Sequence, residues 1–212
     1  MTSPERLYTV EEYLAHEEFA EGRHEYVNGR IYPMAGAEPA HELICTSVSA
    51  ALVAGTRGQP CFVFGSNMRL HVAASDLYTY PDVSGLCGRP QFAPTRPQTL
   101  LNPSFIVEVL SPSTEAYDRG AKFEHYRIVP SLAEYVLIAP GYKSVERYVR
   151  DGTSWRYQAF TRTDELVELP SIGAALRVGD VYERVDALDG PPKSPPTPRL
   201  VREPVTDWGA AV

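Results

Sequence analysis

Two acidic residues of this chain stand in sequence contexts that suit metal chemistry. Glu108 lies inside the apolar run Phe105–Leu110, and a carboxylate buried with such a strand needs a metal ion, a cation or a proton as its partner. Asp82 follows Pro81 on a short extended segment. Carboxylates from adjacent strands can bind one hard cation such as Mg²⁺, which prefers oxygen ligands. A cation held there would lower the pKa of a bound water and stabilise the leaving oxygen of a phosphodiester.

The rarity of lysine draws attention to Lys122. Only three of the 20 Lys and Arg residues are lysines, and lysine, unlike arginine, can lose its proton and acts as a compact point charge. Asp118, Lys122 and Tyr126 are spaced four residues apart, so a helix would place them along one face. Structural alternatives stay open: the spacing also fits an Asp118–Lys122 surface pair, and Glu108 could be a strand-end partner of an arginine.

Strands and helices alternate in the centre of the chain, and hairpins flank them. A capping box begins at Thr9, and Asn28-Gly29 between apolar flanks predicts a tight hairpin turn. The pattern predicts an α/β fold, a single domain with a central mixed β-sheet flanked by helices. Periodicity and turn residues predict helices over 39–54 and 111–128, strands over 61–72, 80–84, 105–110 and 134–139, a loop over 88–103, and a second hairpin of 144–150 with 154–160.

Length and composition indicate one globular domain. The chain has 212 residues and a net charge of −7, which argues against a protein that coats nucleic acid through bulk charge but leaves room for a local basic groove. Residues 1–189 are predicted to form the domain. Residues 190–212 are rich in proline and predict a disordered tail that the fold does not need.

The cysteines and the apolar pattern point to a cytoplasmic protein. Cys45, Cys61 and Cys87 are odd in number and widely spaced, which predicts reduced, dispensable thiols in place of a disulfide framework or a zinc site. Neither a secretory signal nor an apolar run of about 18 residues is readable, so no membrane association is expected.

The order of these motifs resembles the PD-(D/E)xK nuclease superfamily and, more narrowly, the Uma-two family of restriction-type endonucleases. The resemblance covers about residues 8–187, and its most specific part is the run from Glu108 to Ser113 with an aspartate and a lysine downstream. The matching landmarks are Thr9–Leu14, Glu25–Met34, His41, Pro81–Val83, Phe105–Thr114, Asp118, Lys122, Tyr126 and Glu134–Ile138.

The resemblance implies a restriction-endonuclease-like fold and an endonuclease that hydrolyses DNA with Mg²⁺, or Mn²⁺ as a substitute. Asp82 and Glu108 would then be catalytic metal ligands, with Glu25 at the family position of an extra acidic ligand. Leu110 stands where the superfamily motif has lysine. The resemblance therefore implies that Lys122 reaches back from the following helix to the attacking water or the phosphate. A homodimer is expected, because nucleases that cut both strands commonly pair two active sites.

Two other functions stay open from the sequence. One is a catalytically inactive nuclease-like module that binds DNA or dimerises, which the leucine at position 110 and the acidic balance favour. The other is an unrelated metal hydrolase that uses the same carboxylates. His41 and Cys45 lie four residues apart and could be cast as a base and a nucleophile, but a lone histidine near a helix start is more often a capping or packing residue. Both stay outside the predicted catalytic set.

Overall fold

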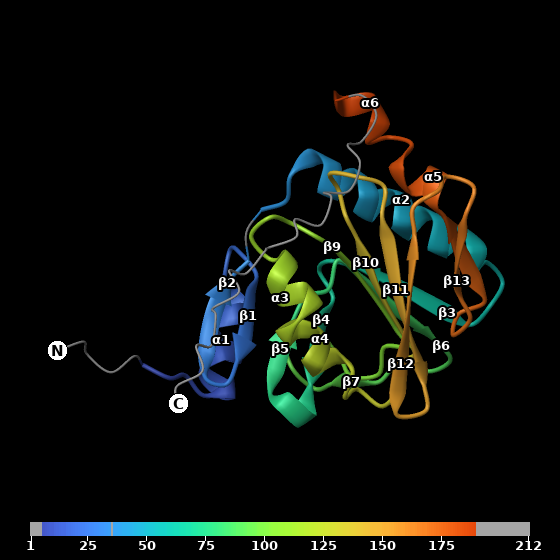
Figure 1. Cartoon of the computed structure of the whole chain (residues 1–212). Helices are drawn as coiled ribbons and strands as arrows, with labels where there is room; N and C mark the ends of the chain where they lie inside the picture. Colours follow the sequence, from blue (N-terminus) through green and yellow to red (C-terminus); the bar gives the residue numbers. More distant parts are fainter. Residues whose placement is uncertain (1–5, 35, 190–212) are drawn as a thin grey trace, which may run out of the picture.

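The computed structural model describes residues 6–34 and 36–189. Its strands form two six-stranded mixed sheets and a separate two-stranded hairpin. Helices lie on both sides of the sheet that contains β9 to β12 (Figure 1). The mixed α/β class predicted from the sequence is confirmed, although the predicted central sheet is divided in two. The proline-rich segment 190–212 lies outside the described residues.

The sheet that carries Glu108 is called the β9 sheet. Its strands pair antiparallel except for the parallel pair β9–β10, in which Glu108 lies opposite Leu137. The parallel pair is joined by the helical segment between the two strands, as parallel strands require. The order is β12 (Ser154–Phe160), β11 (Val145–Asp151), β10 (Glu134–Ile138), β9 (Phe105–Val109), β6 (Val83–Cys87) and β3 (Cys61–Gly65).

The second six-stranded sheet, called the β4 sheet, contains the first hairpin. The turn of that hairpin has Asn28 and Gly29 at φ 49° and 82°, the positive values that an Asn-Gly turn supplies. The predicted hairpin is thereby confirmed. The order is β2 (Arg30–Pro33), β1 (His24–Val27), β5 (Leu77–Thr79), β4 (Arg69–Val72), β8 (Thr99–Leu100) and β7 (Phe92–Ala93).

Alternation along β9 separates two hydrophobic cores. Phe105, Val107 and Val109 face a core formed with α2 (Pro39–Gly55), the hairpin β13 (Leu166–Leu169)–β14 (Ala174–Arg177) and α5 (Val178–Tyr182). Ile106 and Leu110 face the other core, formed with the β4 sheet and α4 (Ala121–Tyr126). Glu108 shares the second face by the period of two, so it points into the layer between the two sheets.

The remaining helices are short apart from α1 (Val10–Phe19), which begins with the predicted capping box of Thr9 and Glu12. α3 (Glu115–Arg119) and α4 lie between the β1–β2 hairpin and the β9 sheet in Figure 1. The other short elements are η1 (Ala73–Ser75) and α6 (Asp186–Asp189). No helix of the described residues is long and apolar enough to cross a membrane.

Three element predictions need correction. The single strand predicted over 61–72 is two strands, β3 and β4, which lie in different sheets. The loop predicted over 88–103 contains the short strands β7 and β8. The helix predicted over 111–128 starts at Glu115 and is interrupted at Gly120, whose φ of −112° and ψ of −100° are not helical. Pattern and propensity do not register such a break, because glycine tolerates both conformations.

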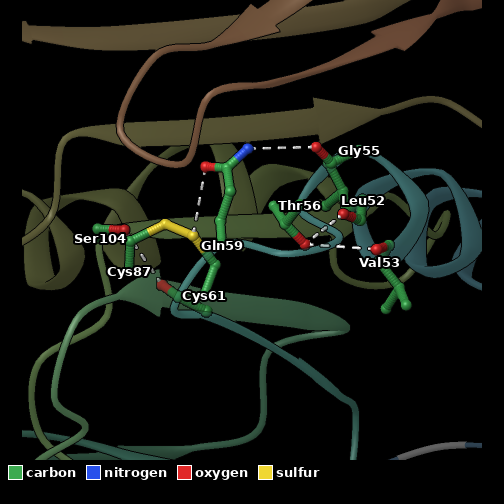
Figure 2. Close-up of a disulfide and its surroundings, with 9 residues drawn as sticks. Leu52, Val53, Gly55, Thr56, Gln59, Cys61, Cys87 and Ser104 are labelled. Atoms are coloured by element: carbon green, nitrogen blue, oxygen red, sulfur yellow. Dashed lines mark hydrogen bonds between the residues drawn. A yellow bond between two sulfur atoms is a disulfide. The ribbon is translucent and has the colours of Figure 1, made fainter.

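The prediction of three free thiols was wrong. Cys61 and Cys87 lie directly opposite each other on β3 and β6, with Cα atoms 3.9 Å apart, and form a disulfide (Figure 2). Cys45 is the free cysteine of the described residues. An odd cysteine count gives no information on cross-strand register, which is set only once the antiparallel partner of β3 is known.

Candidate active site

Glu108 is the centre of a buried polar cluster. Its side chain is 4% exposed, lies on β9 and faces α4. Its Oε1 accepts a hydrogen bond from the Tyr126 hydroxyl at 2.7 Å and lies 2.9 Å from Lys122 Nζ. The strand fixes the carboxylate from one side and the helix fixes it from the other, so its position is determined by two rigid elements.

Lys122 joins three carboxylates from three elements. Besides Glu108, its ammonium lies 3.2 Å from Glu25 Oε1 on β1 and 3.3 Å from Asp118 Oδ1 on α3. The Thr79 hydroxyl donates a hydrogen bond to Glu25. The spacing of four residues thus brings Asp118 and Lys122 together in spite of the break at Gly120, and Lys122 in turn contacts Glu108 on β9. Lys122 is only 6% exposed, so this is a buried cluster and not a surface ion pair.

Asp82 lies immediately before β6 and forms hydrogen bonds with two residues of β9. Its Oδ2 accepts the Val109 backbone N–H at 2.8 Å, and its own N–H donates to Glu108 Oε2 at 3.4 Å. Its side chain is 16% exposed, more than that of Glu108. The antiparallel pair of Val83 with Val107 explains the contact, because it brings the start of β6 beside the end of β9.

α2 adds a histidine to this end of the sheet. His41 Nε2 lies 3.2 Å from Asp82 Oδ2, and its Nδ1 lies 3.5 Å from Cys45 Sγ. Burial alone would lower the pKa of His41, but the hydrogen bond and the charge of Asp82 raise it above the ordinary value. Burial also raises the pKa of the Cys45 thiol strongly, which leaves it protonated and a weak nucleophile.

The electrostatics of the cluster favour an additional cation. Burial raises the pKa of Glu108, and the nearby charges of Asp82 and Asp118 act in the same direction, while Lys122 opposes them. Burial raises the pKa of Asp118 too. Burial alone would lower the pKa of Lys122, but its carboxylate neighbours raise it well above the ordinary value, so the ammonium stays charged. One ammonium does not neutralise this many buried carboxylates, so protons or a metal ion must complete the charge balance.

The donor set fits a divalent metal ion. Asp82, immediately before β6, and Glu108, on the neighbouring strand β9, both offer carboxylate oxygens, which are the ligands that hard cations require. A bound cation also requires negative charge nearby, and the two carboxylates supply it. The residues that would hold the ion are therefore Asp82 and Glu108, with His41 beside Asp82.

The structure brings together all four residues predicted from the sequence. Glu108, Lys122 and Glu25 are in mutual contact through the ammonium, and Asp82 contacts Glu108 through its backbone. Sequence reasoning did not place His41 at the site. No pattern of spacing relates α2 to the start of β6, and only the resemblance, in which His41 was one landmark, carried a signal.

The chain belongs to the Uma2 family. The sequence profile of that family, described as "Putative restriction endonuclease", matches residues 10–179. Two proteins of Synechocystis sp. are similar to this chain and carry the names "Uncharacterized protein slr1290" and "Uncharacterized protein sll1609". The first is 36% identical over 182 residues, which cover 85% of this chain and 94% of the relative. The second is 37% identical over 147 residues, which cover 69% and 83%.

A solved structure shares the fold. It is a crystal structure of a putative nuclease belonging to DUF820 from Anabaena variabilis, with a TM-score of 0.69. The match covers 84% of this chain and 98% of the other, at 20% sequence identity. The fold is therefore that of a DUF820 protein, and at this identity the likeness is one of fold alone.

Proposed function

We propose that this protein is a metal-dependent endonuclease that hydrolyses phosphodiester bonds of DNA. The observation that carries the proposal is the buried carboxylate Glu108, held beside Asp82 and Lys122 where two strands and a helix meet. Membership of the Uma2 family supports the same reaction class. A bound divalent ion would supply an acidified water and would stabilise the leaving oxygen.

The protein's own residues have distinct roles in this proposal. Asp82 and Glu108 bind the ion, and the Tyr126 hydroxyl and the Val109 N–H hold their oxygens in place. Lys122 positions the attacking water or stabilises charge on the phosphate, the role that the superfamily assigns to the lysine replaced here by Leu110. Glu25 contacts Lys122 and Thr79, so we propose that its main role is to orient Lys122. Glu25 could bind the metal ion only if its carboxylate moved away from Lys122.

The reaction class carries the remaining features of the proposal. It implies DNA as the substrate and a homodimer as the active species, with Mg²⁺ or Mn²⁺ as the ion. The expectation of a cytoplasmic location depended partly on free thiols, and the Cys61–Cys87 disulfide removes that support.

The direct test is cleavage of supercoiled plasmid with Mg²⁺, with Mn²⁺ and with EDTA, alongside single-stranded DNA and RNA of matched length. We expect metal-dependent nicking that EDTA abolishes, and sedimentation of the active species as a dimer. Metal binding without cleavage of any of these substrates would instead identify an inactive nuclease-like module. Faster cleavage of RNA than of DNA would show that RNA, and not DNA, is the preferred substrate.

A further inference from the structure

The ring of His41 is held between two neighbours in a way that suits a metal ligand. Its Nε2 faces Asp82 at 3.2 Å, and its Nδ1 lies 3.5 Å from the Cys45 thiol one turn along α2. Histidines that bind metal generally have their second ring nitrogen held by a fixed neighbour, which sets the orientation of the ring. Cys45 occupies that second position, so Nε2 is the nitrogen directed at the acidic cluster.

The spacing of the two facing atoms fits one shared ion. Two ligand atoms about 2.1 Å from a metal ion, at a right angle to each other, lie about 3 Å apart. The 3.2 Å between His41 Nε2 and Asp82 Oδ2 is close to that separation. Of the described residues, His41 and Asp82 belong with Cys45 to a compact group whose ligand atoms all lie within 4.8 Å of one another. The His41 side chain is 14% exposed, which limits competition from water.

We propose that His41 is a nitrogen ligand of the metal ion that Asp82 holds, and that it makes this site select a first-row transition ion over Mg²⁺. The inference rests on the proposed metal-dependent function and names the ion more narrowly. Carboxylates and water suit Mg²⁺ and Mn²⁺ alike, whereas an imidazole adds affinity for transition ions and little for Mg²⁺. Cys45 orients the ring and does not bind the ion.

The test uses Mn²⁺ and the DNA-free protein, so that it does not depend on cleavage. Pulsed electron paramagnetic resonance of the Mn²⁺-loaded wild type should show one directly coordinated histidine nitrogen, and this spectrum requires no variant. His41→Asn should lose that signal. It should weaken Mn²⁺ binding by about tenfold or more, and Mg²⁺ binding, measured by competition, by less than about threefold. Cys45→Ala should keep the nitrogen signal.

A second histidine cluster provides the matched control. His16, Glu17 and His24, on α1 and at the start of β1, also present ligand atoms within 4.8 Å of one another, in a group that shares no residue with that of His41 and Asp82. His16→Asn should leave both the signal and the Mn²⁺ affinity unchanged. Loss of the signal in His16→Asn, with retention in His41→Asn, would place the ion at that cluster and overturn the inference.

The remaining outcomes separate this inference from the proposed function. If Asp82→Asn abolishes Mn²⁺ binding but the wild-type spectrum shows no coordinated nitrogen, the metal centre stands and His41 is not its ligand. A parallel loss of Mn²⁺ and Mg²⁺ affinity in His41→Asn would show that the histidine only positions Asp82. If wild-type protein binds neither ion, the metal-dependent function itself fails, and the inference fails with it.

Discussion

Replacing Lys122 with methionine tests the charge balance of the cluster. The substitution keeps a long unbranched side chain but removes the ammonium that lies 2.9–3.3 Å from Glu108, Glu25 and Asp118. Removing one partner of a buried ion pair costs about 3–5 kcal/mol of unfolding free energy, because the opposite charges are left without compensation. For a chain of this length, about 1 kcal/mol corresponds to roughly 2–4 °C in Tm, so the expected loss is about 6–20 °C.

The pH dependence of this loss has a definite sign. Without the ammonium, the pKa values of Glu108 and Asp118 rise further above their unfolded values, so the folded variant binds protons more strongly than the unfolded chain. The stability conferred by those protons is present at acidic pH and is lost as the pH rises through the raised pKa values. Lys122→Met should therefore be closer to wild type at pH 5 than at pH 8.

Thermal and urea unfolding at the two pH values measure the effect, with Lys143→Met as the control. Lys143 pairs with Asp186 in a partly exposed bridge, so its loss should cost less than about 1 kcal/mol. A divalent ion should raise the Tm of Lys122→Met more than that of wild type, because its charge replaces the missing ammonium. If Lys122→Met unfolds like Lys143→Met at pH 8, the cluster is not a charge-balanced unit and this reasoning is refuted.

Three further predictions concern the framework around the site. Gly85→Ala should destabilise the protein by about 1–3 kcal/mol or more in urea melts, because a Cβ there would lie 2.1 Å from the Phe62 carbonyl oxygen; wild-type stability would mean that β3 and β6 are not so closely paired. Removing the Cys61–Cys87 disulfide, whose sequence separation is 26 residues, should cost about 3 kcal/mol, with reductant lowering the wild-type Tm but not that of the double serine variant. Burial raises the pKa of Glu134 against the hydrogen bonds from Ser171. The stability that Glu134 contributes should therefore fall as pH rises from about 4.3 upward. Glu134→Gln should gain stability relative to wild type as the pH rises, whereas a difference that is constant with pH would exclude this contribution.

The local elements of the fold were largely predictable because they depend on neighbouring residues. The capping box at Thr9, the Asn28-Gly29 turn and the strand around Glu108 follow from side-chain chemistry and a period of two, and each is confirmed. The face of Glu108 was predictable for the same reason. The helix break at Gly120 was not, because tertiary contacts on either side of it decide its conformation.

The long-range contacts were beyond local patterns. The register of β3 against β6 pairs Cys61 with Cys87, and the approach of α2 to β6 brings His41 to Asp82. Both contacts depend on which segments become neighbours in space. The packing of whole helix and sheet faces decides this, and the local sequence around each residue does not. The family resemblance implied that Lys122 reaches back from its helix to the attacking water or the phosphate, but not that it contacts Glu108. The spacing from Asp118 to Tyr126 showed only that these residues share a face.

The most direct test compares two buried glutamates of the same sheet in one cleavage assay. Glu108 faces Lys122 and Tyr126, whereas Glu134, on the adjacent strand β10, accepts a hydrogen bond from the Ser171 N–H at 3.1 Å. Nicking of supercoiled plasmid in the presence of Mn²⁺ should continue at the wild-type rate in Glu134→Gln and be lost in Glu108→Gln, with both variants folded. Wild-type nicking by Glu108→Gln would contradict the proposal that this carboxylate holds the catalytic metal ion.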